Sequence, residues 1–317
     1  MAQANLPDGA NLENLKKQAK ALLKAAKAKD QSALGRVGPY FGYPEAIGLQ
    51  QAQLVLAREY GFRSWTSMKR FVEDGRAPDP LEALSDRFLD LACVSYSNPP
   101  GIGPRRFEQA AQMLADHPDL AGYSLATASV AGNLDAVDRI LTADPDALHR
   151  EDGPFNWPPI MYASYGRLPG RSSFPAAQKL LDAGARGDAF HMWSGVCRFT
   201  ALTGVLGRGE AGEINQPEHP DELGFAEALL DHGADPNDAQ ACYNRGFTGG
   251  NGWLKLLIDR GFDPEHRNDW LVERDGEMVP EGNKTMGYLL AFAIRSGDRE
   301  RVELLINAGA KLNEWEK

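Results

Sequence analysis

The sequence predicts an all-α fold in which helical hairpins stack side by side into a solenoid, with long inserts and an N-terminal helical segment. Three observations predict it. A short phrase with a central Gly recurs along the chain, and helically spaced apolar residues precede each copy. The composition is that of a folded globular chain, because its 317 residues are 43% hydrophobic and 25% charged.

The first 76 residues predict a helical segment of their own. Residues 11–29 place Leu and Ala at helical spacing, and a stripe of lysines lies opposite them (Lys16, Lys20, Lys24 and Lys27). A second helix is expected over 49–60, and Ser64 is placed to cap a third over 65–73. Residues 74–80 are rich in Gly, Pro and Asp, so they predict a linker.

After this linker the sequence predicts a row of paired helices. A capping pair is expected over 81–118, and about five repeat units over 119–317. The repeated phrase reads LLDAGARGD (180–188), LLDHGADPND (229–238), LIDRGFDPEH (257–266) and LINAGAKLNE (305–314). In each copy an apolar pair ends a helix, and Gly is placed to terminate it in the left-handed conformation. Since one such pair cannot bury its apolar face alone, the pairs must stack on each other.

Two phrases carry a resemblance to a known family. LLDHGADPND and VAGNLDAVDRIL (130–141) resemble the second helix and turn of the ankyrin repeat. The family's opening Thr-Pro-Leu-His is degenerate here, with residues 159–162 in its place in one unit and residues 199–202 in another. The resemblance covers about residues 121–314, and the whole chain looks like bacterial ankyrin proteins with a basic helical N-terminal segment. It implies that the first helix of each unit lines a concave face that binds a partner.

Three inserts interrupt the repeat. They are residues 207–222 inside the third unit, residues 267–282 before the last unit, and residues 166–173 in the second unit. Long ordered loops in a compact chain are more often functional than decorative. The alternative is harmless drift, because a longer loop costs little entropy. The sequence leaves both interpretations open.

The charge is unevenly distributed. The net charge is −10, but residues 1–76 carry 12 Lys and Arg against 7 Asp and Glu, which makes them +5 and the remainder −15. An acidic body disfavours nucleic acid and anionic membranes as partners. The lysine stripe is expected to be a solvated helix face, and the basic segment has an alternative use in docking on the acidic body of the same or another chain.

The sequence predicts a cytoplasmic protein without metal or cofactor. No apolar run approaches the roughly 20 residues of a membrane helix, and the N-terminus lacks the pattern of a signal peptide. Cys93, Cys197 and Cys242 fit neither a disulfide framework nor a metal-binding pair, so we expect reduced thiols.

The leading hypothesis for function is capture of a protein or peptide in the concave groove. Three consecutive units place Trp, Tyr and Arg, the residue types that dominate binding hot spots, on or beside their first helices. The alternative for any one of them is a core aromatic or a solvated ion pair. The candidate binding residues are Trp157, Tyr162, Tyr165, Trp193, Arg198, Arg208, Tyr243, Asn244 and Arg245.

The second hypothesis is a metal-independent acid–base enzyme in the same cleft, of hydrolase, lyase or isomerase type. His191, Glu210 and His219 would titrate, while Arg198 or Arg245 would hold a small polar or anionic molecule. The alternative for the Glu and His residues of the 207–222 insert is a solvated acidic loop. An open groove would favour a macromolecular partner, whereas a deep pocket in which His and Glu converge would favour catalysis.

Overall fold

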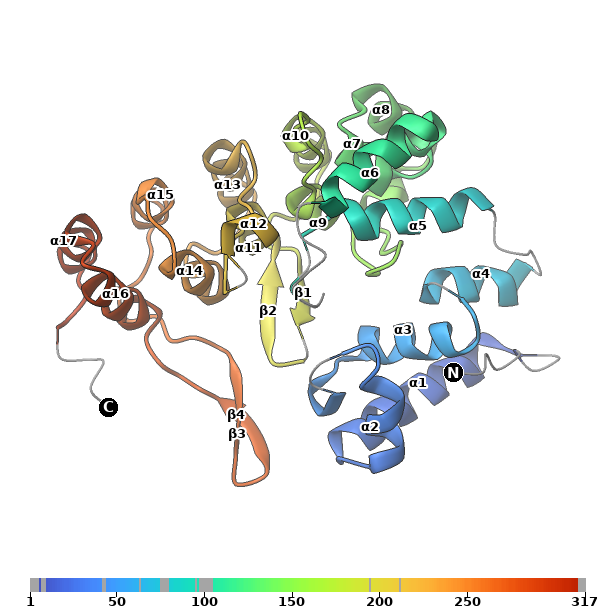
Figure 1. Ribbon diagram of the computed structural model, residues 1–317, viewed down its shortest axis with the longest axis horizontal. Helices are drawn as coiled ribbons and strands as arrows, with labels where there is room; N and C mark the ends of the chain where they lie inside the picture. The colour runs from blue at the N-terminus through green and yellow to red at the C-terminus, as the bar shows by residue number, and fades with distance from the viewer. Residues whose placement is uncertain are drawn as a thin grey trace.

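The computed structural model of the chain is mostly helical. It describes residues 6, 10–41, 44–62, 64–74, 80–94, 96, 105–193, 195–210 and 212–312. The helices form two bodies that pack against each other, a small N-terminal group and a long row of helical pairs (Figure 1).

The N-terminal segment contains the three predicted helices and one that the sequence did not indicate. They are α1 (Leu12–Lys27), α2 (Gln31–Val37), α3 (Leu49–Glu59) and α4 (Trp65–Asp74), with a 3-10 turn at Pro44–Ala46. Asn11 caps α1 and Asp30 caps α2, each accepting a hydrogen bond from a backbone N–H three residues ahead. Two apolar clusters of this segment are separate from the core of the row, and Leu15 and Leu22 on α1 belong one to each.

Within the described residues, the row consists of six successive helical pairs in chain order, each with an inner and an outer helix. The inner helices are α5 (Pro80–Ala92), α7 (Leu125–Ala131), α9 (Pro159–Tyr165), α11 (Ala201–Leu206), α14 (Ala239–Gly246) and α16 (Thr285–Ser296). The outer helices are α6 (Arg105–Asp116), α8 (Leu134–Ala143), α10 (Phe174–Asp182), α13 (Glu222–Asp231), α15 (Gly252–Asp259) and α17 (Arg299–Asn307). Each inner helix packs on the next, so a single apolar core runs along the row (Figure 1). The 3-10 turns Pro118–Gly122 and Pro145–His149 and the short α12 (Gly212–Asn215) lie in the connections.

The repeated phrase terminates outer helices as the sequence predicted. Its glycines, Gly184, Gly233, Gly261 and Gly309, have φ values of 104°, 97°, 94° and 106°. The residue after each glycine donates a backbone hydrogen bond to the carbonyl five residues earlier, for example Ala185 to Leu180 and Ala234 to Leu229. This is the Schellman geometry, which a side chain at the glycine position would disfavour.

Two short β-hairpins project from the row between inner helices. β1 (Phe190–Trp193) pairs with β2 (Cys197–Thr200), and β3 (Leu271–Arg274) pairs with β4 (Glu277–Pro280). Asp275 and Gly276 join the second pair with φ values of 53° and 85°, the signs that a type I′ turn requires. The sequence treated residues 267–282 as an irregular insert, and strands of four residues give too short a pattern to be recognised.

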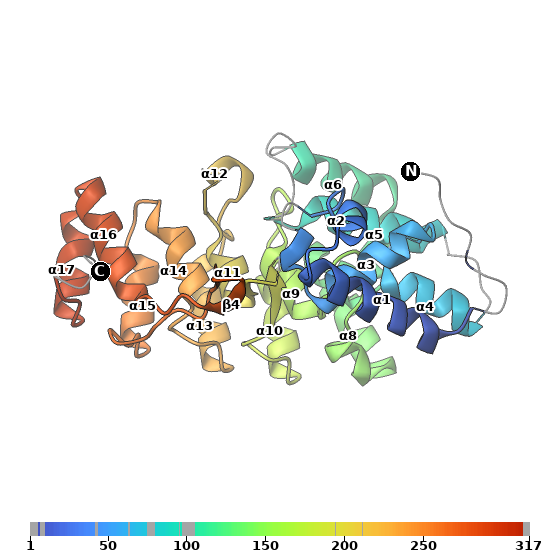
Figure 2. The ribbon, with the colours of Figure 1, turned by 90° about the horizontal axis from the view of Figure 1, so that it is seen from below.

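The N-terminal segment packs against this hairpin side of the row, below α5 to α9 in Figure 1 and overlapping them in Figure 2. Lys29 pairs with Glu273 at 2.7 Å, and Arg70 pairs with Asp152 at 2.9 Å. The amide of Gln51 donates to the Met192 carbonyl at 2.5 Å. The basic segment therefore contacts the acidic row of its own chain.

No described helix combines the length and the apolar composition needed to cross a bilayer. Cys93, Cys197 and Cys242 are all described, and each is buried and carries a free thiol.

Candidate binding site

Aromatic rings form the inner surface of the row at its centre. Trp157 precedes α9, Tyr165 ends α9, and His191 lies on β1. The centroid of Trp157 is 4.6 Å from that of His191 and 4.9 Å from that of Tyr165. Tyr96 stands edge-on to Tyr165 at 6.4 Å and donates its hydroxyl hydrogen to the Arg208 carbonyl. The hairpin thus places His191 within a stack of core aromatics.

A cavity of about 110 Å³ lies between these rings and the N-terminal segment. Its walls include Trp157, Tyr165 and His191 from the row and Tyr40 and Arg58 from the segment. We call it the aromatic cavity. Neither body forms it alone, because the N-terminal segment closes it against the row.

His191 is neutral in this position. Burial lowers the pKa of its imidazole to about 3. Its Nδ1 atom is buried without a hydrogen-bond partner among the described residues. A group that stays uncharged down to such a low pH is poorly suited to acid–base work near neutrality.

A second aromatic surface lies on the C-terminal half of the inner face. Rings from α14, α16 and the segment before β3 contact one another with centroid distances of 4.8 to 6.0 Å. Its five residues are Tyr243, Phe247, Trp270, Tyr288 and Phe292, and we call them the aromatic patch. Phe247 remains 44% exposed, and the other four are half-buried.

Carboxylates lie at the edge of the aromatic patch. Glu210, from the third-unit insert, accepts a hydrogen bond from the Tyr243 hydroxyl at 2.5 Å. Glu281 accepts from the Tyr288 hydroxyl at 2.8 Å and from the Asn268 amide at 2.8 Å. The patch therefore combines apolar faces with negative charge.

Of these residues the sequence identified Tyr243 and Glu210, but it missed the rest of the patch. Tyr243 lies on α14 and Phe247, four residues later, is its C-cap, and Tyr288 and Phe292 repeat this spacing on α16. Side chains four residues apart share one helix face. Two such aromatic pairs on successive inner helices are the signal that would have indicated the patch.

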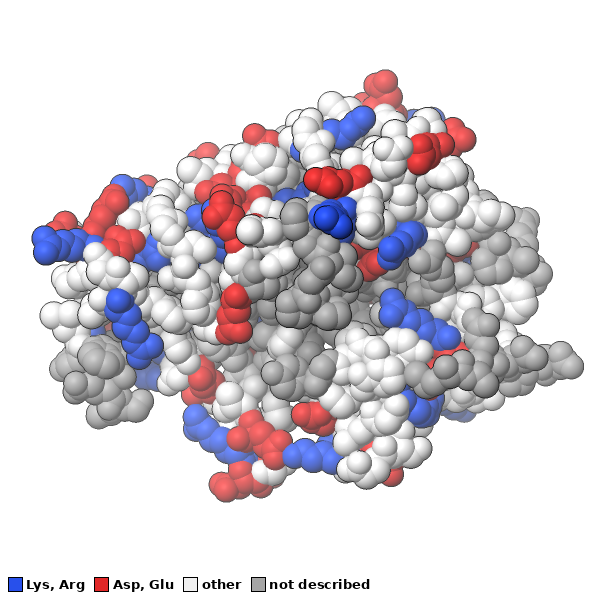
Figure 3. All heavy atoms as spheres, in the orientation of Figure 1, with Lys and Arg blue, Asp and Glu red and all other residues white. Residues whose placement is uncertain are grey.

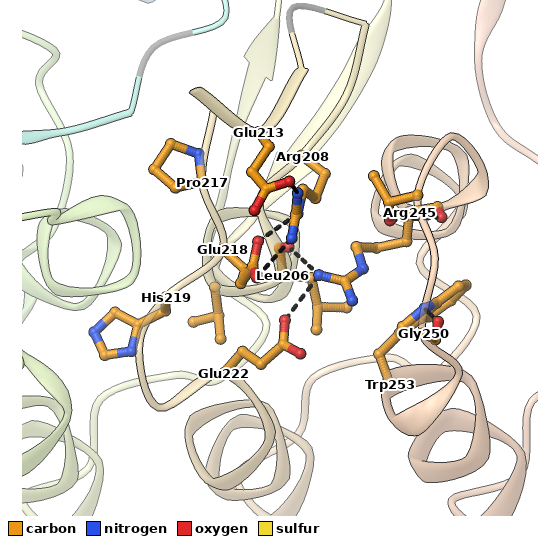
Figure 4. A network of polar contacts seen from close by, with 12 residues as sticks. Leu206, Arg208, Glu213, Pro217, Glu218, His219, Glu222, Arg245, Gly250 and Trp253 are labelled. Atoms are coloured by element: carbon orange, nitrogen blue, oxygen red, sulfur yellow. Dashed lines mark hydrogen bonds and ion pairs between the residues drawn. The ribbon is translucent and has the colours of Figure 1, made fainter. Parts of the chain in front are cut away.

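The third-unit insert is held by a network of ion pairs (Figure 4). Arg208 contacts Glu213 at 2.6 Å and Glu218 at 2.7 Å, and Arg245 contacts Glu222 at 2.8 Å. Arg208 adopts a φ of 63°, which a non-glycine residue rarely does. Arg208 cross-links the insert internally, and Arg245 on α14 ties it to the start of α13.

Five of the predicted binding residues are buried side chains. Trp157 and Tyr165 line the aromatic cavity, while the other three contact only their own chain and are corrected. Tyr162 is in the core, where its hydroxyl donates to the Asp152 carbonyl at 2.7 Å. Asn244 is buried and accepts from Gln240 at 2.9 Å. Arg245 is buried and also donates to the Leu206 carbonyl at 3.1 Å. None of the three offers a surface to a partner in the groove.

His219 is corrected for the same reason. It is almost fully buried, with Nε2 2.9 Å from the Ser173 hydroxyl, while Nδ1 accepts from the Asp221 N–H at 3.1 Å. Burial, with help from the nearby Arg167 charge, lowers its pKa to about 3. His219 is therefore a neutral structural residue that anchors the start of α13.

Arg198 and Trp193 lie on the first hairpin. The Arg198 guanidinium is exposed and stands 4.0 Å over the Phe190 ring. It also lines a cavity of about 150 Å³ with Asp188, Asp238 and Asp269. Trp193 faces Cys197 in the β1–β2 register and packs 5.9 Å from Phe199. Neither residue belongs to the aromatic patch.

The predicted catalytic residues are not brought together. His191 lies in the aromatic cavity, Glu210 at the aromatic patch and His219 under α13. No hydrogen bond or ring contact joins any two of them within the described part of the chain. Nowhere among the described residues do three or more His, Cys, Asp or Glu side chains lie close enough together to hold a metal ion.

Comparison with known proteins adds no family. Neither a protein-family model nor a curated protein sequence matches this chain.

Proposed function

We propose that the chain is an ankyrin-type solenoid that binds a basic peptide segment of a partner protein on its aromatic patch. The repeat phrase, the stacking of inner helices and the two projecting hairpins support the solenoid. The aromatic patch is the observation that carries the binding function.

The patch has the composition of a binding hot spot. Tyr and Trp supply large contact areas at low entropy cost, and they dominate measured hot spots. Contiguous exposed apolar surface on a soluble protein usually marks an interaction site. Here the rings of Tyr243, Phe247 and Phe292 lie beside each other, and Phe247 is 44% exposed.

Charge favours a basic segment over an acidic or neutral one. Glu210 and Glu281 each accept a hydrogen bond from a patch tyrosine. A carboxylate has about four lone-pair sites, so each can still accept from a donor of the partner. Lys or Arg of a partner would lie over the ring faces and pair with these carboxylates. The visible face in Figure 3 intersperses acidic and basic side chains, with no continuous basic area among its described residues, which speaks against nucleic acid.

The enzyme hypothesis receives less support. That hypothesis requires a pocket in which His and Glu side chains converge. Instead, His191, Glu210 and His219 lie in three separate environments. His191 and His219 both have pKa values near 3, so neither is poised to exchange a proton near neutral pH.

The experiment is a selection of peptides from a display library against the full chain, followed by fluorescence polarisation with a labelled selected peptide. We expect enrichment of Lys or Arg next to apolar residues. Replacing Phe247 by Ala should raise the dissociation constant by about tenfold or more, since a hot-spot truncation costs on the order of 2 kcal/mol.

Phe190→Ala is the matched control, because Phe190 on β1 is 43% exposed against 44% for Phe247. It should leave the dissociation constant unchanged. Equal weakening by both variants, or a selected pool that is acidic, would contradict the proposal.

A further inference from the structure

We propose that the aromatic cavity binds a small aromatic carboxylate, with its ring against the core aromatics and its carboxylate on Arg58. This site is separate from the aromatic patch and does not depend on the function proposed above. The cavity lies where α3 of the N-terminal segment faces α9 and β1 of the row.

The deep wall of the cavity suits a flat apolar ring. Trp157 and Tyr165 are buried side chains, and their ring centroids lie 4.9 Å apart. Phe155 continues this wall at 4.5 Å from Trp157, and Tyr40 and Phe41 face it from the N-terminal segment. Aromatic groups pack on such walls in offset or edge-on arrangements.

The mouth of the cavity carries a cation without a carboxylate partner. Arg58 lines the cavity, is exposed to solvent and lies 5.6 Å over the Tyr40 ring. No carboxylate of the described residues forms an ion pair with it. A guanidinium binds a carboxylate through two parallel hydrogen bonds, so an anionic ligand group fits this position.

Among the described residues that line the cavity, Asp90 is the acidic one. Its carboxylate pairs with the Arg87 guanidinium at 3.1 Å. His191 contributes no charge, because its imidazole is neutral. The cavity is thus apolar at its base and cationic at its mouth, which selects an anionic ligand over a cationic one.

Size limits the ligand to one ring. The cavity volume of about 110 Å³ is below the roughly 150 Å³ of an engineered cavity that binds benzene. This cavity is open on one side, so a ring can occupy it while its carboxylate stays at the mouth.

The test is titration calorimetry of the full chain with benzoate as the probe. Benzyl alcohol serves as a neutral comparator and benzylammonium as a cationic one. We expect benzoate to bind about tenfold more tightly than either, since the charge-assisted pair with Arg58 is available to benzoate alone. No saturable binding of benzoate, or equal binding of all three probes, would overturn the proposal.

Variants locate the site. Arg58→Gln should weaken benzoate binding about tenfold, to the level of benzyl alcohol. Lys69→Gln removes a positive charge from the same segment at an exposed position outside the cavity, and should leave binding unchanged. Equal affinity of the wild type and Arg58→Gln would refute the site. Since Arg58 is exposed, unfolding curves of both variants should match the wild type, and binding is measured on folded chains.

Discussion

Buried arginines stabilise the ends of the inner helices. Arg106 donates to carbonyls at the end of α5, Arg167 to carbonyls at the ends of α9 and α11, and Arg301 to carbonyls after α14. The last carbonyls of a helix have no partner inside the helix, and they carry the negative end of its dipole. A fixed fork of donors satisfies several of them at once.

Arg301→Ala should lower the free energy of unfolding by about 3–5 kcal/mol, because it strands several buried carbonyls and an ion-pair partner. Arg301 donates to the carbonyls of Thr248 at 2.6 Å and Gly250 at 3.0 Å and to the Asn251 side chain at 2.8 Å. Urea unfolding measures the loss. The exposed neighbour Arg299 is the control, and Arg299→Ala should change stability by less than about 0.5 kcal/mol.

His219 gives the stability a defined pH dependence. Its pKa is about 3 in the folded chain and about 6.5 when unfolded. Between these values only the unfolded chain binds the proton, so stability that is complete above about pH 6.5 is lost as the pH falls toward 3. Protonation would also remove the Nδ1 acceptor that the Asp221 N–H uses. Between the two pKa values, the titration of His219 lowers the free energy of unfolding by about 1.4 kcal/mol for each unit by which the pH falls.

Urea unfolding at several pH values from 7 to 4 tests this. His219→Gln retains an acceptor but does not titrate, so its stability should fall less steeply than that of the wild type by about 1.4 kcal/mol per pH unit. Parallel curves for the two chains would show that His219 is not the titrating group.

At the scale of elements, the turn of the first hairpin packs closely against the backbone of the N-terminal segment. Gly195, in the β1–β2 turn, has a φ of 72° and lies directly against the Ala46 carbonyl. A Cβ built there would be 1.9 Å from the Ala46 oxygen. No rearrangement of a flexible side chain relieves such a contact, because the atom it meets belongs to the backbone.

Gly195→Ala should therefore separate the segment from the hairpin. We expect backbone amides of α3 to exchange hydrogen about tenfold faster, while α14 to α17 keep their protection. Gly170→Ala is the matched control, since its φ is 69° and no atom lies within 4 Å of an added Cβ. Gly170→Ala introduces the strain of a side chain at positive φ without a contact to another segment. Faster α3 exchange in both variants would therefore contradict the role of the Gly195–Ala46 contact.

Elements with strong local signals were predictable from the sequence. The Gly-terminated phrase located the ends of α10, α13, α15 and α17, because Gly at a helix end has a specific conformational role. The hairpins and α2 were not recognised, since elements of seven or fewer residues give too short a pattern to distinguish from a loop.

The candidate site was only partly predictable for a different reason. Helical spacing identified Tyr243 on an inner helix, but it also selected Tyr162, Asn244 and Arg245, which are buried. Whether a given ring is buried, as in Tyr162, or exposed, as in Phe247, depends on the packing of neighbouring pairs. The aromatic cavity also needs residues more than 100 positions apart, such as Arg58 and His191, and no local pattern relates them.

At the scale of the whole molecule, opposite charges help to hold the two bodies together. The segment of residues 1–76 is net +5 and the remainder −15. Arg70 links them, because it lies 2.9 Å from Asp152 and 3.7 Å from Glu82. Such exposed pairs are individually weak and sensitive to salt.

Arg70→Glu replaces this attraction by repulsion among three carboxylates. At low salt we expect a loss on the order of 1 kcal/mol in docking of the segment, seen as roughly fivefold faster amide exchange in α4. Raising the salt concentration should reverse part of the effect by screening. Lys69→Glu adds the same charge change at an exposed position that makes no ion pair among the described residues, and it should have little effect.

Hydrogen exchange of the full chain, with and without a saturating selected basic peptide, tests the central claim most directly. Binding on the aromatic patch predicts new protection in α14, α16 and the β3–β4 hairpin, where Tyr243, Phe292 and Trp270 are held. Protection confined to the outer helices α8, α10 and α13, with α14 and α16 unchanged, would contradict it.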